Sequence, residues 1–295
     1  MIDHEPIFRD SVLNQRLFEE GYITLPFLDQ EEVEDLRQLF WNHHSAVESA
    51  EGLHISSHIK EDSEIQHISD QIQKIFKRAI VEHIENGMTL GGTFISKPPN
   101  QTEPLQPHQD WSIVDESRFR SFTIWVPLED VTDENGCMYV LPKSHEYVRG
   151  YRHISIDSVF GQIYETVWKH MEPVYLKAGE AIVFDHALGH ASKPNTTDKV
   201  RIAATHSLIS RNHEMRFYWN NNGVVEEYVG KSDFYNTPEA KTGPIGLKKI
   251  RDLDFKPHQL TEEEFLNLLN KVATNDSGKS RWATILLNRF LKMID

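Results

Sequence analysis

A histidine and a carboxylate two residues apart are the first feature of this chain that could do chemistry. His108 and Asp110 flank Gln109. On a β-strand, residues i and i+2 point to the same face, so the imidazole and the carboxylate would aim at one point. Two histidines and one carboxylate on one face of a metal, with the opposite face open, are the ligands expected of non-haem Fe(II) oxygenases. The pair therefore predicts two metal ligands, with an ordinary surface pair as the alternative.

The third ligand must come from another strand. The apolar run 181–184 predicts such a strand, and it leads into His186 and His190. Either imidazole could complete the set. His190 is favoured because Arg201 follows eleven residues later, at the start of the next predicted strand. If these strands are antiparallel neighbours, His190 and Arg201 can face one cavity.

Arg201 indicates a second ligand beside the metal. A 2-oxoglutarate molecule that chelates the metal needs a fixed cation for its far carboxylate, and arginine offers a bidentate fork. Ser192, two residues after His190, could donate its hydroxyl to the same carboxylate. The alternatives are a structural ion pair of Arg201 with Asp198 or Asp185, and a Ser192 hydroxyl that only satisfies backbone.

The first third of the chain, residues 1–86, is predicted to be mostly helical. A short helix should precede the extended segment 21–26. Asp29 and Glu32 then form a capping box that begins a second helix. Apolar residues at helical spacing predict a long amphipathic helix over 62–85.

Residues 87 to about 210 change character. Short alternating runs bounded by Gly, Pro and Asn predict β-strands, the clearest over 121–128. Asn135-Gly136 is the strongest hairpin signal. Many short strands without a parallel βαβ rhythm predict a mainly β fold with flanking helices, a double-stranded β-helix or jelly roll of the cupin-like type.

The remaining segments have no steady period. Residues 145–170 should form a long loop, and residues 211–255 an ordered lid, because a loop of that length in a compact domain is usually functional. A capping box of Thr261 with Glu264 begins a C-terminal helix. A last apolar helix is predicted over Trp282–Met293. We expect one domain over residues 1–295.

Composition excludes several classes of protein. The formal net charge of −14 argues against nucleic-acid and anionic membrane partners. Cys137 is the single cysteine, so a reducing compartment is expected. The first residues resemble no signal peptide, and no apolar run reaches the roughly 18 residues of a membrane span. A cytoplasmic protein is the expectation; the number of subunits is not determined.

Several separate motifs, taken in order, resemble the phytanoyl-CoA dioxygenase family of Fe(II)/2-oxoglutarate oxygenases. They lie mainly within residues 94–209, and Gly21-Tyr22 with the helix at Asp29 resembles the family's opening. The family has glycine where this chain has Lys143, at a position that shapes a turn. The matching residues are Lys97-Pro98, His108-Gln109-Asp110, Trp125, Leu128-Glu129-Asp130-Val131, Glu134-Asn135-Gly136, Pro142-Lys143-Ser144-His145, Gly179-Glu180, Phe184, His190-Ala191-Ser192, Asn195 and Arg201.

This resemblance implies the cofactors and the residues that hold them. Fe(II) would be bound by His108, Asp110 and His190. The 5-carboxylate of 2-oxoglutarate would be held by Arg201 and Ser192. Its 1-carboxylate could contact Lys97, although a lysine at a strand end is usually solvated.

The resemblance also implies a reaction. Related halogenases have Gly or Ala at the position of Asp110, so the carboxylate favours hydroxylation. We expect oxidation of an unactivated C–H bond of a small organic metabolite by dioxygen, with decarboxylation of 2-oxoglutarate to succinate. The alternative is a metal-binding, cupin-like jelly roll without 2-oxoglutarate turnover, which would have no use for a carboxylate clamp of Arg201 and Ser192.

The identity of the substrate is less constrained. A small polar metabolite is our preference, with specificity set by the segments 145–170 and 211–255. Polar and aromatic residues of those segments are candidates to contact it: Arg149, Arg152, Arg211, Arg216, Tyr218 and Trp219. Three further aromatics could line the substrate pocket or pack in the core: Trp111, Trp125 and Tyr139.

Overall fold

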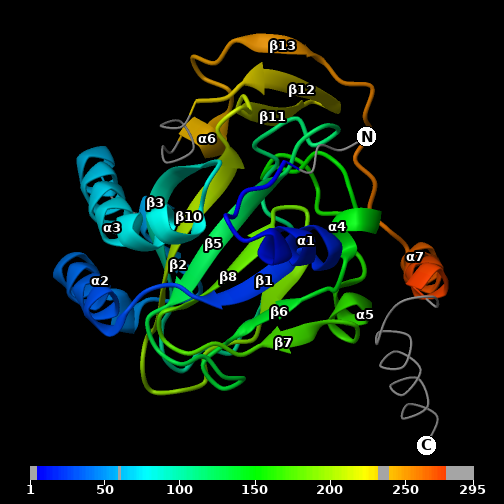
Figure 1. The fold of residues 1–295 in the computed structure, drawn as a ribbon. Coiled ribbons are helices and arrows are strands. Elements are labelled where there is room, and N and C mark those ends of the chain that lie inside the picture. The colour runs from blue at the N-terminus through cyan, green and yellow to red at the C-terminus, as the bar shows by residue number, and fades with distance from the viewer. Residues whose placement is uncertain (1–4, 59–60, 232–238, 277–295) are drawn as a thin grey trace, which may run out of the picture.

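Two antiparallel sheets pack against each other at the centre of the protein (Figure 1). The computed structural model describes residues 5–58, 61–231 and 239–276. The larger sheet has the order β1 (Tyr22–Pro26), β8 (Glu180–Asp185), β5 (Ser121–Pro127), β10 (Arg201–Ser210), β3 (Gly87–Lys97) and β2 (His54–Ile55). The smaller sheet has the order β4 (Leu105–His108), β9 (His190–Ser192), β6 (Met138–Val140) and β7 (Glu172–Val174).

The eight consecutive strands β3 to β10 define the topology. Strands β3, β5, β8 and β10 lie in the larger sheet, and β4, β6, β7 and β9 in the smaller one. The chain therefore passes repeatedly from one sheet to the other, which confirms the predicted double-stranded β-helix. Strands β1 and β2, from the N-terminal part, extend the two edges of the larger sheet.

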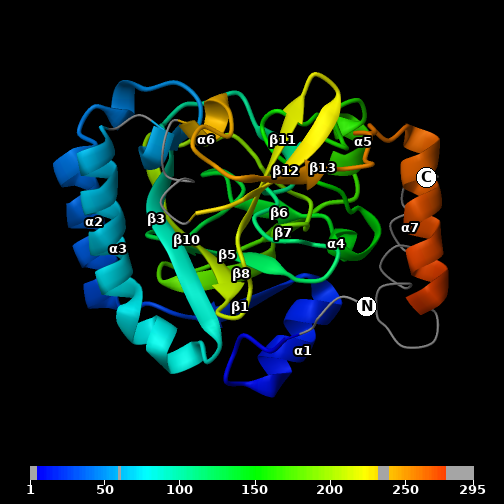
Figure 2. The same ribbon diagram turned by 90° about the horizontal axis from the view of Figure 1, so that it is seen from above.

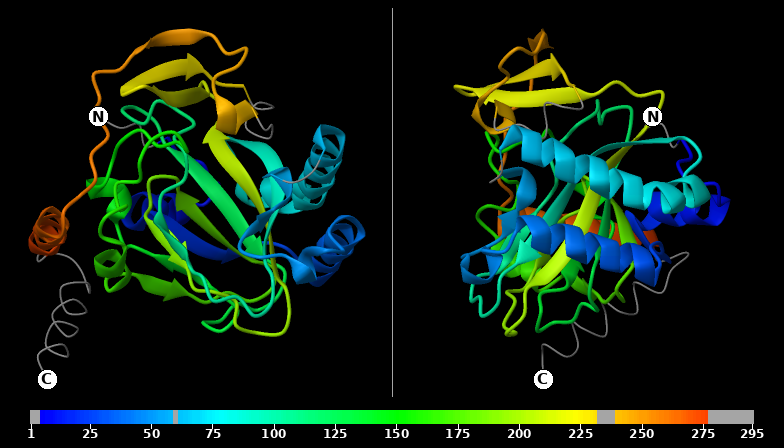
Figure 3. Two further views of the ribbon diagram at one scale, coloured as in Figure 1. Left: turned by 180° about the vertical axis from the view of Figure 1, so that it is seen from behind. Right: turned by 90° about the vertical axis from the view of Figure 1, so that its left-hand side faces the viewer.

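Three helices precede the jelly roll, as predicted: α1 (Ser11–Glu20), α2 (Gln30–His43) and α3 (Asp62–His83). The capping box at the start of α2 is present, since Glu32 N donates to Asp29 Oδ1 at 2.9 Å and Asp29 N donates to Glu32 Oε2 at 3.0 Å. Helices α2 and α3 run side by side along one flank of the molecule (Figures 2 and 3). They cover the outer face of the larger sheet.

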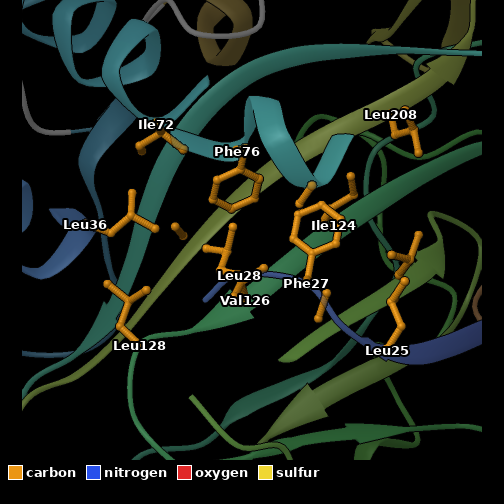
Figure 4. Close-up of a cluster of buried hydrophobic side chains, with 14 of the residues drawn as sticks. Leu25, Phe27, Leu28, Leu36, Ile72, Phe76, Ile124, Val126, Leu128 and Leu208 are labelled. Atoms are coloured by element: carbon orange, nitrogen blue, oxygen red, sulfur yellow. The ribbon is translucent and has the colours of Figure 1, made fainter. Parts of the chain in front are cut away.

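The apolar faces of α2 and α3 meet the larger sheet in one continuous core (Figure 4). Leu36 of α2, Phe76 of α3 and Ile124 of β5 are all fully buried there. Burying a side chain of this size contributes about 1.5–3 kcal/mol relative to leaving it exposed. This layer fixes the larger sheet as a rigid base for the residues on its other face.

Strand β5 shows how the site is separated from this core. All seven residues of the strand are buried. Ile124 and Val126 face the helices, whereas Trp125 faces the interior between the two sheets. Because successive side chains on a strand alternate between faces, Thr123 shares the interior face with Trp125.

The prediction of a lid without regular structure over 211–255 is wrong. A third antiparallel sheet forms here from β11 (Arg216–Asn221), β12 (Val224–Val229) and β13 (Lys249–Asp252), and Figure 1 shows it above one end of the jelly roll. Its strands escaped prediction because aromatic residues pack on both faces of the sheet, which leaves no alternation of apolar and polar residues. Phe217, Trp219 and Tyr228 pack in one cluster, whereas Tyr218 packs in another.

The prediction of a hairpin at Asn135-Gly136 is also wrong, because the strands before and after it, β5 and β6, belong to different sheets. Asn135 instead closes a loop, with its Nδ2 donating to Asp130 O at 2.8 Å. Within the described residues, Asn222-Gly223 forms a two-residue hairpin that joins β11 to β12. Both residues have positive φ, 51° and 92°, as a type I′ turn requires.

The segment 145–170 is irregular, as expected, apart from two short helices, α4 (Ser144–Tyr147) and α5 (Tyr164–Trp168). Lys143 immediately precedes α4 and has a φ of 57°. This left-handed conformation favours glycine, the residue that the resemblance to the family implies at this position.

The C-terminal part begins with α6 (Glu239–Thr242) and continues to α7 (Glu262–Asp276). The capping box of α7 is confirmed, because Thr261 N donates to Glu264 Oε2 at 2.8 Å and Glu264 N donates to Thr261 Oγ1 at 3.3 Å. The helix predicted over Trp282–Met293 lies outside the described residues. Two short 3₁₀ helices, Val47–Ser49 and Ser56–His58, complete the elements of the described chain.

Among the described residues, none of the helices combines the length and apolar character needed to cross a lipid bilayer.

Candidate functional site

The three predicted metal ligands converge inside the jelly roll. His108 ends β4 and His190 begins β9, and the two residues are direct partners in the pairing of these strands. Asp110 lies just beyond the end of β4, so its orientation does not come from strand alternation as predicted. One potential ligand atom from each residue lies within 4.8 Å of the others, and Asp110 Oδ1 is 3.7 Å from His190 Nε2.

Both imidazoles are oriented by backbone carbonyls. His108 Nδ1 lies 2.8 Å from Gln106 O, and His190 Nδ1 lies 3.0 Å from Leu188 O. Because a carbonyl oxygen can only accept, each Nδ1 must carry the proton, which leaves Nε2 as the lone-pair donor. A hydrogen bond of this kind fixes the tautomer of metal-binding histidines. Burial, with the neighbouring His190, lowers the pKa of His108 to about 4, so its imidazole is neutral at pH 7.

The carboxylate of Asp110 is held by a residue that sequence analysis missed. Thr123 Oγ1, on the interior face of β5, donates to Asp110 Oδ2 at 2.7 Å and leaves Oδ1 directed toward the histidines. Burial acts to raise the pKa of Asp110, but the surrounding histidines and Thr123 outweigh it, so the pKa is lowered. Thr123 lies two residues before Trp125, and this spacing was the one signal that could have identified it.

A cavity of about 230 Å³, called here the inner cavity, extends from the triad into the space between the sheets. Arg201, Ser192, Thr123 and Trp125 line it together with the three predicted ligands. Its remaining wall is apolar and comes largely from strands of both sheets and from the 53–55 segment: Leu53, Ile55, Ile95, Leu105, Gly136, Met138, Phe184 and Ala191.

Arg201 has the features of a residue that awaits an anion. Its side chain is 3% exposed, and its Nε and Nη1 atoms have no hydrogen-bond partner within the described chain. The structural ion pair with Asp198 or Asp185 that sequence analysis left open does not occur among the described residues. The guanidinium group lies 5.3 Å from the centre of the Trp125 ring. Burial lowers the pKa of Arg201 to about 10, which still leaves it charged at pH 7.

Lys97 is placed differently from the other predicted cofactor contacts. It pairs with Arg201 across β3 and β10 and is buried. Its ammonium group donates to the backbone carbonyls of Ser192, at 3.2 Å, and of Lys193. Lys97 is not among the side chains that line the inner cavity, so the geometry does not favour a contact with the 1-carboxylate.

A second and larger cavity, called here the outer cavity, lies on the other side of His108 and has a volume of about 500 Å³. Its wall is the irregular segment 147–159, together with residues 255–268 and Trp111. Gln109, the middle residue of the metal motif, ties this segment to the site, because its Nε2 donates to Val148 O at 2.8 Å and to Ala187 O at 2.5 Å.

Arg152 supports the metal motif from the outer cavity. Its Nε donates to the backbone carbonyl of Asp110 at 2.7 Å, and its Nη1 and Nη2 atoms donate to the two oxygens of Glu116 at 2.7 and 2.5 Å. Sequence analysis had named Arg152 as a substrate contact and had missed Glu116. This bidentate pair instead makes Arg152 a positioning residue for the loop that carries Asp110.

The other candidate residues lie on a cavity wall or elsewhere in the protein. Trp111 lines the outer cavity and Trp125 the inner one, whereas Tyr139 lines neither and donates its hydroxyl to Asp133. His186, the rival of His190, is buried with Nδ1 donating to Trp111 O at 3.1 Å and is outside the metal-ligand cluster. Four candidates of the third sheet and its approach line neither cavity: Arg211, Arg216, Tyr218 and Trp219.

Comparison with known proteins identifies relatives of this chain. A protein of Arabidopsis thaliana named phytanoyl-CoA dioxygenase is 33% identical over 122 residues, which are 39% of this chain and 42% of that protein. Phytanoyl-CoA dioxygenase domain-containing protein 1 of Danio rerio is 28% identical over 153 residues, 49% of this chain and 52% of that protein. The crystal structure of EctD from S. alaskensis with 2-oxoglutarate and 5-hydroxyectoine matches 70% of this chain and 78% of that one, with a TM-score of 0.48 and 18% identity.

The chain spans about half of the length of the curated relatives that it matches, or somewhat less. A model that describes one protein family matches a larger part of this chain. The family described as phytanoyl-CoA dioxygenase (PhyH), which uses Fe(II) and 2-oxoglutarate, matches residues 18–203. This match covers well over half of the chain and includes all three residues of the triad and Arg201. The chain therefore belongs to the phytanoyl-CoA dioxygenase (PhyH) family.

Proposed function

We propose that this protein is an Fe(II)/2-oxoglutarate-dependent dioxygenase that hydroxylates a C–H bond of a small organic molecule held in the outer cavity. The observation that carries the proposal is the arrangement of the inner cavity. A cluster of two histidines and one aspartate lies on its wall, and a buried arginine with unpaired N–H groups lies on the same wall.

The donor set fits Fe(II). His108 and His190 each offer Nε2 with the tautomer fixed by a backbone carbonyl, and Asp110 offers Oδ1 while Thr123 occupies its other oxygen. Two imidazoles and one carboxylate match the facial triad of non-haem iron oxygenases. The hydrogen bonds behind each ligand are the outer contacts that orient such ligands.

The inner cavity fits a dicarboxylate. Arg201 would hold the 5-carboxylate of 2-oxoglutarate through its unpaired nitrogens, and the Ser192 hydroxyl lines the same cavity. A buried donor without a partner costs about 1–3 kcal/mol, so a carboxylate that satisfies Arg201 recovers a penalty already present in the free protein. The apolar remainder of the wall would exclude water from the bound molecule.

When bound, iron and 2-oxoglutarate supply an oxidation in which dioxygen is consumed, 2-oxoglutarate is decarboxylated to succinate and the substrate gains a hydroxyl group. The protein's own part is ligation, orientation and exclusion of bulk water. His108 lines both cavities, so a substrate in the outer cavity would lie beside the metal. A small residue at the position of Asp110 would leave one coordination site of the metal free. Asp110 would fill that site, which favours hydroxylation.

The helical part, the jelly roll and the C-terminal segment belong to one catalytic unit in this proposal. Leu53 and Ile55 of the N-terminal part help to line the inner cavity, and Phe255 and Leu268 help to line the outer one. The single cysteine is consistent with a reducing compartment, and we propose a cytoplasmic location.

The test is an anaerobic titration of the Fe(II)-loaded protein with 2-oxoglutarate, followed by the visible charge-transfer absorption of the chelate. We expect a band in the wild type. In Arg201→Ala the same band should need roughly tenfold to a hundredfold more 2-oxoglutarate, since a hydrogen bond to a charged group contributes about 1.5–3 kcal/mol. Lys199→Ala, at an exposed cation two residues away, is the matched control and should titrate like the wild type.

Two outcomes would contradict the proposal. Bound iron without any band on addition of 2-oxoglutarate would favour a cupin-like enzyme that uses a metal alone. Failure to bind iron would favour a jelly-roll binding protein without turnover.

A further inference from the structure

The outer cavity contains one arginine that the proposed mechanism does not use. Arg149 lines the wall beside His108 and Gln109. All three of its side-chain nitrogens are shielded from solvent and have no hydrogen-bond partner within the described chain. This state is costly, because a buried donor that makes no hydrogen bond has lost its hydration without replacing it.

The nearest carboxylate forms an ion pair with Arg149 but accepts no hydrogen bond from it. Arg149 Nη2 lies 3.8 Å from Asp185 Oδ2, which is beyond hydrogen-bond distance. Asp185 already has better partners, since its Oδ2 accepts from Arg120 Nη1 at 2.8 Å and its Oδ1 accepts from Ala187 N at 2.7 Å. Arg149 is thus the second cation beside a carboxylate whose hydrogen bonds go to other groups.

Arg152, three residues further along the same wall, has hydrogen-bond partners for all three of its side-chain nitrogens. Its guanidinium group makes a bidentate contact with Glu116 and also binds two backbone carbonyls. The remaining charged side chains of the outer cavity, Asp157 and His258, are exposed, and His258 is bonded to Glu264. Among the charged residues of this wall, Arg149 is therefore the one with spare capacity to bind an anion.

Much of the outer cavity is apolar and aromatic, although polar residues such as His153, Asp157 and Ser158 also line it. Its volume of about 500 Å³ lies within the size range of sites for small organic ligands. Apolar and aromatic side chains from both wall segments and from the metal motif line it: Trp111, Tyr147, Val148, Tyr151, Ile154, Ile156, Val159, Phe255, Pro257, Leu260 and Leu268. A small polar metabolite without an apolar body, in line with the preference drawn from the sequence, would leave this apolar part of the surface without matching contacts.

We propose that the substrate is an organic oxyanion with an apolar body, whose carboxylate or phosphonate group is bound by Arg149 while the body fills the aromatic part of the outer cavity. This inference rests on the proposed function, because it places the substrate next to the metal site. Arginine suits the role, since its planar fork binds both oxygens of an oxyanion at once. The oxyanion would replace Asp185 as the main partner of Arg149.

The experiment is a binding comparison by calorimetry under anaerobic conditions, with the full-length protein, Fe(II) and saturating 2-oxoglutarate. The probes share one apolar chain and differ in the head group: octanoate, octylphosphonate and neutral octanamide. We expect at least one of the two anions to bind ten or more times more tightly than the amide. In Arg149→Met this preference should disappear, whereas Arg149→Lys should retain part of it.

Controls separate this inference from other sources of anion binding. Arg118→Ala removes an exposed cation outside both cavities and should keep the full preference. Thermal melting of each variant shows whether Arg149 is needed for folding through Asp185. The experiment is repeated without metal and 2-oxoglutarate, and in Arg201→Ala, so that anion binding in the inner cavity is recognised.

The outcomes are distinguishable. A preference for the anion that depends on Arg149 supports the inference even if the titration with 2-oxoglutarate fails, in which case only the proposed function falls. Equal binding of anion and amide, no binding of any probe, or a preference that survives in Arg149→Met would each overturn the inference. If the preference for the anion over the amide is lost only in Arg201→Ala, the anion binds in the inner cavity, and the inference is overturned.

Discussion

The inner and outer cavities meet at His108, but different kinds of structure form their walls. Most of the inner wall comes from strands that hydrogen bonds fix on both sides, and its polar residues other than Asp110 lie on strands. The outer wall comes from irregular backbone, the segment 147–159 and residues 255–268. Sites on strands hold their geometry more tightly than sites on loops, which vary more easily. In the proposed function, the chemistry lies on the rigid part and the choice of substrate on the adaptable one.

Each cavity has one arginine with unpaired nitrogens. Arg201 begins strand β10 at the inner cavity, and Arg149 follows α4 at the outer one. If the comparison is right, changes at the inner site should abolish the reaction regardless of substrate, whereas changes at the outer wall should alter which molecules bind. Substitutions at the two sites and in the segments around them test this division.

Asp110→Ala should reduce hydroxylation to background while the fold is retained, because it removes one of the three proposed metal ligands without touching the core. Iron content and succinate formation measure the effect, and circular dichroism verifies the fold. Asp198→Ala, which removes an exposed carboxylate near Arg201, is the matched control and should keep full iron content. Near-normal turnover by Asp110→Ala with native metal content would show that the triad is wrongly assigned.

Thr123→Val should weaken metal binding about tenfold to a hundredfold, the usual effect of losing a hydrogen bond behind a ligand. The substitution keeps the volume of the side chain but removes the hydroxyl that donates to Asp110 Oδ2. The dissociation constant for Fe(II) is the measurement, and Thr123→Ser, which retains the hydroxyl, should bind nearly as the wild type does. Equal affinities in all three proteins would mean that Asp110 is oriented by other contacts.

Glu129, close to Arg201, should make stability depend on pH. Burial raises the pKa of Glu129 to about 7, against the effect of Arg201 and of the Ile202 N–H group that it accepts. The folded protein then binds a proton more tightly than the unfolded chain, so this contribution to stability is present below about pH 4.5 and is lost as the pH rises through about 7. Urea unfolding from pH 5 to 8 should show a smaller decline in Glu129→Gln than in the wild type, and parallel curves would contradict the assignment.

Lys143→Gly should have the smallest effect, a stabilisation of about 1 kcal/mol or less. Lys143 has a φ of 57° before α4, where the outer wall begins, and an L-residue is strained there. Glycine removes that strain but loses more chain entropy on folding, so the gain is modest. Lys143→Ala loses the same side chain yet keeps the strain, and it should be no more stable than the wild type. A glycine variant less stable than the alanine variant would contradict this account.

The sequence determined those features that depend on neighbouring residues. The capping boxes at Asp29 and Thr261 and the strands from 87 to 210 follow from local propensity and alternation, and the structure has them. The chemistry of His108, Asp110 and His190 also followed from residue type and order. The sheet β11–β13 was not predicted, because the aromatic residues of its strands recur with no simple period.

Only the tertiary structure distinguishes residues that look alike in the sequence. Asn135-Gly136 and Asn222-Gly223 are the same dipeptide, but only the second joins paired strands, because pairing depends on the sheet to which each flanking strand belongs. Arg149 and Arg152 are the same residue three positions apart. Arg152 is hydrogen-bonded to Glu116, whereas Arg149 has no such partner. The difference depends on which partners the fold brings within hydrogen-bond distance, and no local sequence pattern shows this.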